Sequence, residues 1–236
     1  MSASLIDFIC ASLVMGLGIG TDVAIATVLR AKQLYSLKRA MFWIIGVSLT
    51  HTLFPMVGYL FTYFSIQAIP LLTPIVGLLA FLCISHFLWQ EISELNQPPA
   101  DDNRQLIVSL SLILAVSWDA LWSGPAKSAQ VVDWSTLMIW SSFAFVGILV
   151  LVIAVSSWLA GHWIMLAKQQ SLIPLATPFA LWLQYSIIGY FGLLALLRYT
   201  FALTISWWQL LFVSSLIIAA VLNIRYIQTR HHKTAT

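Results

Sequence analysis

The chain has 236 residues, of which 61% are hydrophobic and only 8% carry a charge. Soluble domains carry about 25% charged residues, so this composition excludes an ordinary water-soluble protein. The formal charge of +3 does not indicate a nucleic-acid partner, because the cations cluster at the ends of apolar runs and form no basic stripe with interleaved aromatic residues. Cys10 and Cys83 form no CxxC pair, which argues against a thiol-redox carrier.

Seven apolar runs follow one another along the chain, each long enough to cross a hydrocarbon core of about 30 Å. They are 5–29, 41–64, 68–90, 106–126, 137–160, 175–197 and 203–224. The first run has no basic segment before it and no A-x-A cleavage site within its first 30 residues, so we expect a retained span. The sequence therefore predicts an all-α, polytopic membrane protein with seven transmembrane helices.

Lysine and arginine predict the orientation of these spans, since cytoplasmic loops carry the excess of basic residues. With seven spans, nine basic residues fall on one side and only Lys127 and Arg198 on the other. The nine are Arg30, Lys32, Lys38, Arg39, Arg104, Lys168, Arg225, Arg230 and Lys233. We therefore expect a bacterial inner (cytoplasmic) membrane protein with its N-terminus outside and its basic C-terminal tail in the cytoplasm.

Two aspartates, Asp22 and Asp119, lie well inside apolar runs, while the other acidic residues are expected in loops or near span ends. Glu91 is one of these other acidic residues, as the first residue of the polar linker 91–105. A carboxylate at membrane depth costs roughly 2.5–3.5 kcal/mol even on the most lenient scale, and is a functional-site hypothesis by default. The alternative is a hydrogen-bonded role in helix packing.

The surroundings of the two aspartates are alike, which predicts an internal repeat. Arg30 follows Asp22 by eight residues, and Lys127 follows Asp119 by eight. Eight helical residues rise about 12 Å, which carries each cation to the membrane surface, where it would steer charge. Because the two spans run in opposite directions, the pattern predicts two inverted three-helix units, as in many secondary transporters. We expect repeats at 1–92 and 106–200, a cytoplasmic linker at 93–105, and an additional helix with a basic tail at 201–236.

Glycine and proline collect near the same depth. Gly16, Gly18 and Gly20 precede Asp22, and Pro55 and Pro125 interrupt the second and fourth runs. Such residues either loosen a helix and expose backbone carbonyls or allow close helix packing. We assign the two prolines an expected role in gating.

His51 lies four residues before Pro55 and is the third candidate ligand. Imidazole binds divalent transition metals and titrates near neutrality, although a hydrogen-bonded core histidine is an equal alternative. Asp22, Asp119 and His51 would form an oxygen-and-nitrogen metal site that suits manganese, iron or zinc. The hydroxyl groups expected to complete it belong to Thr21, Thr50 and Ser117.

Residues 21–24 (Thr-Asp-Val-Ala), the Thr-x-x-Pro-x-x-Gly run within 46–58, and residues 117–120 (Ser-Trp-Asp-Ala) resemble the manganese-efflux pump family of the lysine-exporter superfamily. The resemblance implies that Asp22 and Asp119 are essential for export. That family has six spans and carries an acidic residue where this chain has His51.

The favoured hypothesis is a secondary transporter that exports a manganese-like divalent cation as its substrate, with no permanently bound cofactor. A proton-coupled exporter of a small organic solute, such as an amino acid, is the alternative, with the aspartates as proton carriers. We do not expect an enzyme, because neither HExxH nor a nucleophile with a positioned base is present. The lipid bilayer is the certain partner, whereas the coupling ion and a homo-oligomeric state stay open.

Overall fold

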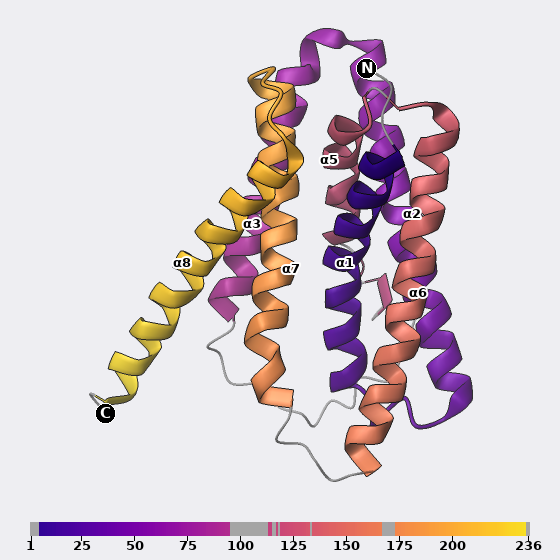
Figure 1. Ribbon diagram of the computed structural model, residues 1–236, viewed down its shortest axis with the longest axis vertical. Coiled ribbons are helices and arrows are strands. Elements are labelled where there is room, and N and C mark those ends of the chain that lie inside the picture. Colours follow the sequence, from indigo (N-terminus) through magenta and orange to yellow (C-terminus); the bar gives the residue numbers. More distant parts are fainter. Residues whose placement is uncertain are drawn as a thin grey trace.

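The computed structural model is a bundle of long helices that run roughly parallel to one axis (Figure 1). It describes residues 5–94, 113–114, 117, 119–132, 134–166 and 173–234, without the side chains of 94, 119, 165–166, 173–177 and 226–234. All regular structure in these ranges is helical. The α-helices are α1 (Leu5–Leu29), α2 (Leu37–Ala68), α3 (Thr73–Glu94), α5 (Ser123–Gln130), α6 (Thr136–Leu166), α7 (Ile173–Ala195) and α8 (Trp207–Thr234).

Three short helical segments join or extend these helices. The 3-10 segment η1 (Pro70–Leu72) connects α2 to α3, and η2 (Asp119–Trp122) leads directly into α5. The π-helical segment η4 (Leu196–Thr200) continues α7. All three come where glycine, proline or a charged residue interrupts an apolar run, which is where regular i to i−4 bonding is weakest.

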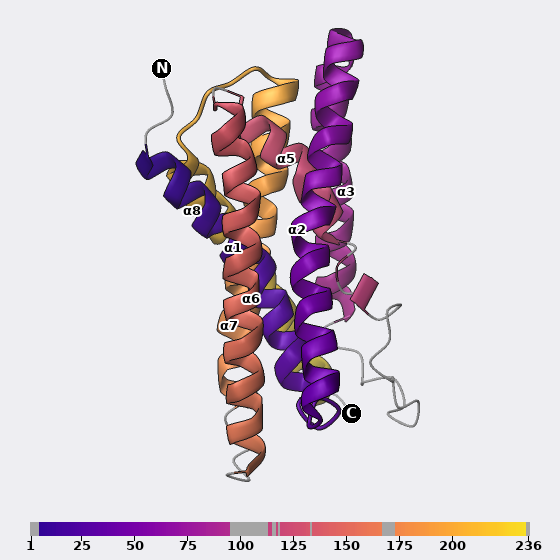
Figure 2. The same ribbon diagram turned by 90° about the vertical axis from the view of Figure 1, so that its right-hand side faces the viewer.

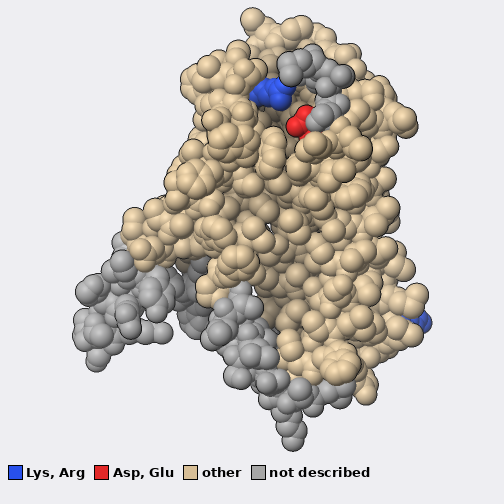
Figure 3. All heavy atoms as spheres, viewed as in Figure 1, with Lys and Arg blue, Asp and Glu red and all other residues tan. Residues whose placement is uncertain are grey.

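Six helices in the described part of the chain are long and apolar enough to cross a membrane. They are Leu5–Leu29, Leu37–Ala68, Pro70–Ser93, Thr136–Ile164, Pro178–Thr200 and Trp207–Arg225. They correspond to six of the seven expected runs, and the architecture is that of a membrane-embedded protein. On the face drawn in Figure 3, few Lys, Arg, Asp or Glu side chains are visible among the coloured atoms, as expected of a surface that meets lipid. The remaining expected run, 106–126, lies largely outside the described residues.

Several helices extend beyond the apolar runs, as the second and third helices illustrate. The second helix begins four residues earlier and ends four residues later than the run 41–64. The third helix continues past Gln90 to Glu94, so Glu91 belongs to α3 and not to a linker. A hydropathy pattern ends at the first charged residue, whereas helical hydrogen bonding continues as long as neighbouring helices satisfy the side chains.

The core lies between two groups of helices. Figure 2 shows α2 and α3 on one side and α1, α6 and α7 on the other. Helix α1 packs against α6 and α7, while α2 packs against α5, η2 and α6. Helix α3 packs against α7 and η4, and α8 packs mainly against α7. From this contact α8 diverges toward the C-terminus (Figure 1).

Candidate functional site

Asp22 lies on α1, seven residues before the helix ends at Leu29. Its Oδ1 accepts a hydrogen bond of 3.2 Å from Nε2 of Gln184 on α7. Thr21 beside it donates to the carbonyl of Leu17 at 2.6 Å, so this hydroxyl is satisfied within its own helix. The structure therefore joins the predicted aspartate to α7 and leaves Thr21 as a local helix contact.

The glycines before Asp22 bring neighbouring helices close to it. A Cβ at Gly16 would lie 2.6 Å from Leu149 of α6, and one at Gly18 would lie 2.5 Å from Ile187 of α7. Small residues at such positions let helix backbones approach closely in membranes. Close packing is thus the role that the structure gives these glycines, and it sets Asp22 against α7.

A second carboxylate, Glu91, lies near Asp22 although the sequence pattern did not predict it as a site residue. Tyr185, which follows Gln184 on α7, donates a hydrogen bond of 3.4 Å to Oε2 of Glu91 on α3. Asp22 and Glu91 are close enough to interact electrostatically. The neighbours Gln184 and Tyr185 thus hold carboxylates from α1 and α3 on two sides of α7. The polar residues Gln184 and Tyr185 inside an apolar run were the sequence signal for this arrangement.

Arg30 follows the last residue of α1 and forms the cationic end of this group. Its Nη1 donates to the carbonyl of Ala26 at 3.0 Å, and its guanidinium lies 5.3 Å from the ring centre of Trp43 on α2. Trp43 in turn donates to Oγ1 of Thr27 at 2.9 Å. Burial lowers the pKa of Arg30, while the charge of Asp22 opposes that shift. A guanidinium stays protonated under such perturbation, so it supplies a fixed positive charge.

His51 lies on α2 and is buried, with 1% of its surface exposed. Its Nδ1 is 2.7 Å from the carbonyl oxygen of Val47 and 3.2 Å from Oγ of Ser117. Because a carbonyl only accepts, Nδ1 carries the hydrogen and Nε2 presents a bare lone pair. Nε2 has no hydrogen-bond partner among the described atoms.

Thr50 and Ser117 join His51 in one polar contact between α2 and the fourth apolar run. Their hydroxyl oxygens are 2.6 Å apart, and Ser117 also donates to the carbonyl of Ile113 at 2.8 Å. The structure therefore brings together three of the predicted site residues. Pro55, one turn further along α2, is buried inside a helix that continues without a break.

Asp119 is the first residue of η2, and its side chain lies outside the described part of the structure. Pro125 falls in the first turn of α5, which closely contacts α2. A Cβ at Gly124 would meet the backbone of Gly58 and Tyr59, so these helices touch through glycine. Lys127 in α5 is fully buried, donates to Gln130 at 3.2 Å and lies 4.9 Å from the ring centre of Trp134.

The predicted residues thus fall into two described groups: Asp22 with Gln184 and Glu91, and His51 with Thr50 and Ser117. Within the described ranges, no three His, Cys, Asp or Glu side chains are arranged to hold a metal ion. The ligand set that includes Asp119 reaches beyond these ranges, and it stays a prediction.

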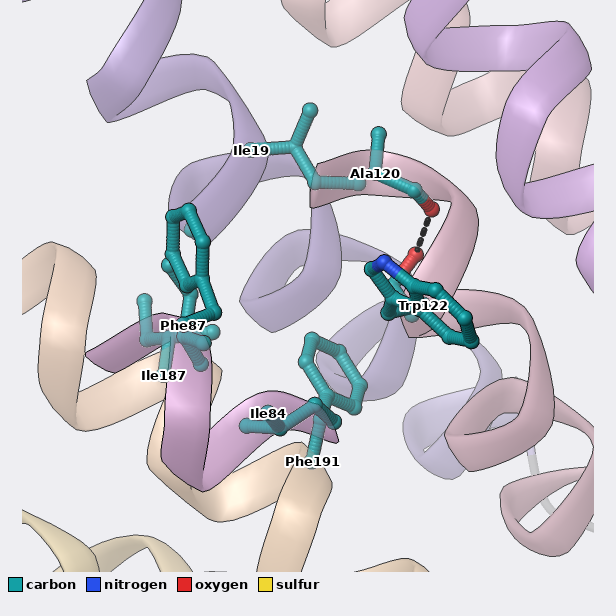
Figure 4. Close-up of a pocket in the computed structure, with 10 residues that line it drawn as sticks. Ile19, Ile84, Phe87, Ala120, Trp122, Ile187 and Phe191 are labelled. Atoms are coloured by element: carbon teal, nitrogen blue, oxygen red, sulfur yellow. Dashed lines mark hydrogen bonds between the residues drawn. The ribbon is translucent and has the colours of Figure 1, made fainter. Parts of the chain in front are cut away.

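A small apolar cavity of about 30 Å³ lies between α1, α3, α7 and η2. Figure 4 shows Ile19, Phe87, Ile187 and Phe191 around it, beside Ala120, whose carbonyl accepts a hydrogen bond of 2.7 Å from Ser123. Gly18 also lines it, one turn before Asp22. This volume holds a water molecule or two but no larger solute.

Comparison with known proteins gives no match: no family model, no curated protein and no solved structure is similar to this chain.

Proposed function

We propose that this protein is a secondary transporter of a bacterial inner membrane and that Asp22 is its central ion-binding group. The observation that carries the proposal is the carboxylate of Asp22 inside a membrane-spanning helix, bonded across the bundle to Gln184. Ionisable groups at this depth are rare, face a bundle interior and mark ion or proton pathways. Glu91 on α3 adds a second carboxylate next to it.

The packing pattern supports two inverted units that alternate access around this site. In this comparison α1 corresponds to α5, α2 to α6 and α3 to α7. Helix α1 packs on α6 and α7, and its counterpart α5 packs on α2 and α3, the counterparts of α6 and α7. The cations of both units also stack on tryptophan, Arg30 on Trp43 and Lys127 on Trp134. Trp43 is the seventh residue of α2, the second helix of its unit, and Trp134 comes two residues before α6 begins.

The chain path supports seven crossings. Helix α3 ends toward the lower end of the bundle in Figure 1, α5 lies in its upper half, and α6 begins at the upper end. A connection from the lower to the upper end therefore lies between α3 and α6. With seven crossings, the bias of basic residues assigns the N-terminus to the outside and the C-terminus to the cytoplasm.

For the substrate, we propose a manganese-like divalent cation held by Asp22, Asp119 and His51. Two carboxylates neutralise one divalent ion, and the bare Nε2 of His51 presents the lone pair that a transition metal requires. The resemblance to manganese-efflux pumps favours the same substrate.

The second candidate is proton-coupled export of a small organic solute, and the character of the interior favours it. The small cavity beside Gly18 is lined almost entirely by apolar side chains. His51 and Asp22 form hydrogen bonds with different residues, Val47 and Gln184. In this case Asp22 carries the coupling proton.

Transport into proteoliposomes separates these candidates. Manganese uptake that is lost in both Asp22→Asn and Asp119→Asn, but kept in the control Asp7→Asn near the outer end of α1, supports the metal transporter. Solute-driven proton movement that requires Asp22, with no response to any metal, supports the second candidate. If the double Asp22→Asn, Asp119→Asn protein transports normally, the transporter mechanism itself is wrong.

A further inference from the structure

A second and larger cavity, of about 620 Å³, lies near the end of the bundle opposite to the C-terminal tail. Its walls come from the last part of α2, from the α5–α6 connection and from η4. Pockets for small organic ligands have volumes of about 300–1,000 Å³. The cavity thus has the size of a ligand site and is far larger than the cavity between α1, α3, α7 and η2.

Aromatic rings form a large part of this wall, and several of them pack against one another. Tyr59 lies 5.9 Å from Tyr63 and 6.4 Å from Trp140, measured between ring centres, and the second pair meets edge to face. Trp134 and Tyr199 contribute two further rings. Such pairs favour defined ring orientations, because the edge of one ring is attracted to the face of the other. The wall is therefore preorganised for a flat or branched apolar body.

Hydroxyl and amide groups give the same wall a polar part. Tyr199 donates from its hydroxyl to Oγ of Ser128 at 2.7 Å, and Gln67 donates from Nε2 to the hydroxyl of Tyr63 at 2.8 Å. Both bonds join residues that line the cavity. Ligand pockets of this kind combine apolar walls with a few placed polar groups.

The π-helical segment η4 places Tyr199 in this wall. Thr200 in the same turn donates to the carbonyl of Pro74 at 2.9 Å, and a Cβ at Gly77 would lie 2.7 Å from Tyr199. Glycine at this position of α3 is therefore needed for η4 to pack there. Single π-helical turns are often found at functional sites.

Burial lowers the pKa of Lys127 to about 7, so at pH 6 the charge next to the cavity is positive. The ammonium group of Lys127 lies 4.9 Å from the ring centre of Trp134, which lines the wall. Neither an acidic nor a basic side chain is among the described residues that line the cavity. An organic cation would meet aromatic faces but also the repulsion of Lys127, whereas an anion would be attracted by it. Charge complementarity therefore favours an anionic ligand.

We propose that this outer cavity binds a small organic carboxylate with an aromatic or branched apolar body. The body lies against the rings of Tyr59, Trp134 and Trp140, and the carboxylate points toward the side of Lys127. This proposal goes beyond the transport function, because equilibrium binding at the outer cavity requires neither a transport cycle nor Asp22.

The test is equilibrium binding of labelled benzoate at pH 6, where Lys127 is protonated, to the full-length protein in lipid nanodiscs, with benzyl alcohol as the neutral probe of the same shape. We expect wild type to bind benzoate at least tenfold more tightly than benzyl alcohol. Lys127→Met should weaken benzoate binding about tenfold and leave benzyl alcohol binding unchanged, because it removes the positive charge beside Trp134 that attracts the carboxylate.

Two tryptophan variants separate the cavity from the rest of the surface. Trp140→Leu, at a partly exposed wall position, should weaken both probes about fivefold, whereas Trp208→Leu on the exposed face of α8 should change neither. Equal binding of both probes, or equal effects of the two tryptophan variants, overturns the proposal. Asp22→Asn should keep benzoate binding, so a failure of the transport mechanism is distinguishable from a failure of this site.

Discussion

Nε2 of Gln184 on α7 lies 3.2 Å from Oδ1 of Asp22 on α1, and the next residue on α7, Tyr185, bonds Glu91 on α3. Consecutive helical residues differ by about 1.5 Å in height, so the two carboxylates are held at similar depth. Two consecutive residues of α7 thus bond to α1 and to α3. Any movement of α7 relative to α1 changes the environment of Asp22, which is what a transport cycle around this residue requires.

The first prediction concerns the bond between Gln184 and Asp22. Gln184→Leu removes a buried amide that donates to the carboxylate, and we expect transport to fall at least tenfold. Thermal stability should fall by only about 1 kcal/mol, the usual contribution of a hydrogen bond between membrane helices. The measurement is proteoliposome flux together with an unfolding curve. Gln209→Leu on the exposed face of α8 is the control, and equal flux in both variants would contradict the role of Gln184.

The second prediction concerns the glycine contact between α2 and α5. In Gly124→Ala the new Cβ meets the backbone of Gly58 and Tyr59, which cannot rotate away. Overpacking of this kind costs typically 1–3 kcal/mol, and we expect the variant in the upper part of this range. Gly192→Ala on α7 is the matched control, because its nearest contact, at 3.1 Å, is a side-chain methyl group of Ile84 and not backbone. Unfolding in mild detergent would compare the two, and equal stability would show that α5 is not in close contact with α2.

The sequence predicted the membrane fold well because one physical rule, the length of apolar runs, determines it. The first helix has the predicted bounds, Leu5–Leu29. Glu91 was misplaced because hydropathy cannot recognise a charged side chain that a partner on another helix satisfies. Gln184 and Tyr185 were missed for the same reason, since which face of α7 meets α1 is a property of packing. Thr50, His51 and Ser117 lie in contact, but Asp22, expected in the same site, bonds Gln184 instead, and the position of the Asp119 side chain stays a prediction.

The third prediction tests the seven crossings. Green fluorescent protein fused after Thr236 should fluoresce, because the tail is expected in the cytoplasm, where this reporter folds. Alkaline phosphatase fused after Ile205, between η4 and α8, should be active because that connection is expected outside. With an even number of crossings both chain ends would lie on one side of the membrane, and an added N-terminal tag would then have the same accessibility as the C-terminal reporter.

The last prediction is a pH dependence of stability that comes from Lys127, which lies outside the six candidate spans. Burial lowers the pKa of Lys127 from its ordinary value of 10.5 to about 7. Its surroundings are Gln130 on the same helix, Trp134, and Tyr190 on α7, which bonds Gln130 and interacts electrostatically with Arg198. Between pH 7 and 10.5 the unfolded chain therefore holds a proton that the folded protein has released.

Stability must rise with pH wherever the unfolded state binds more protons, so wild type should become more stable from pH 7.5 to 9. One proton limits the slope to about 1.4 kcal/mol per pH unit. Lys127→Met should remove this rise, and Lys38→Met, at an exposed position on α2, should retain it. Saturating benzoate should reduce the slope, because a nearby carboxylate favours the protonated ammonium. Thermal unfolding of the three proteins at several pH values measures this, and a slope that persists in Lys127→Met would assign the titration to another group.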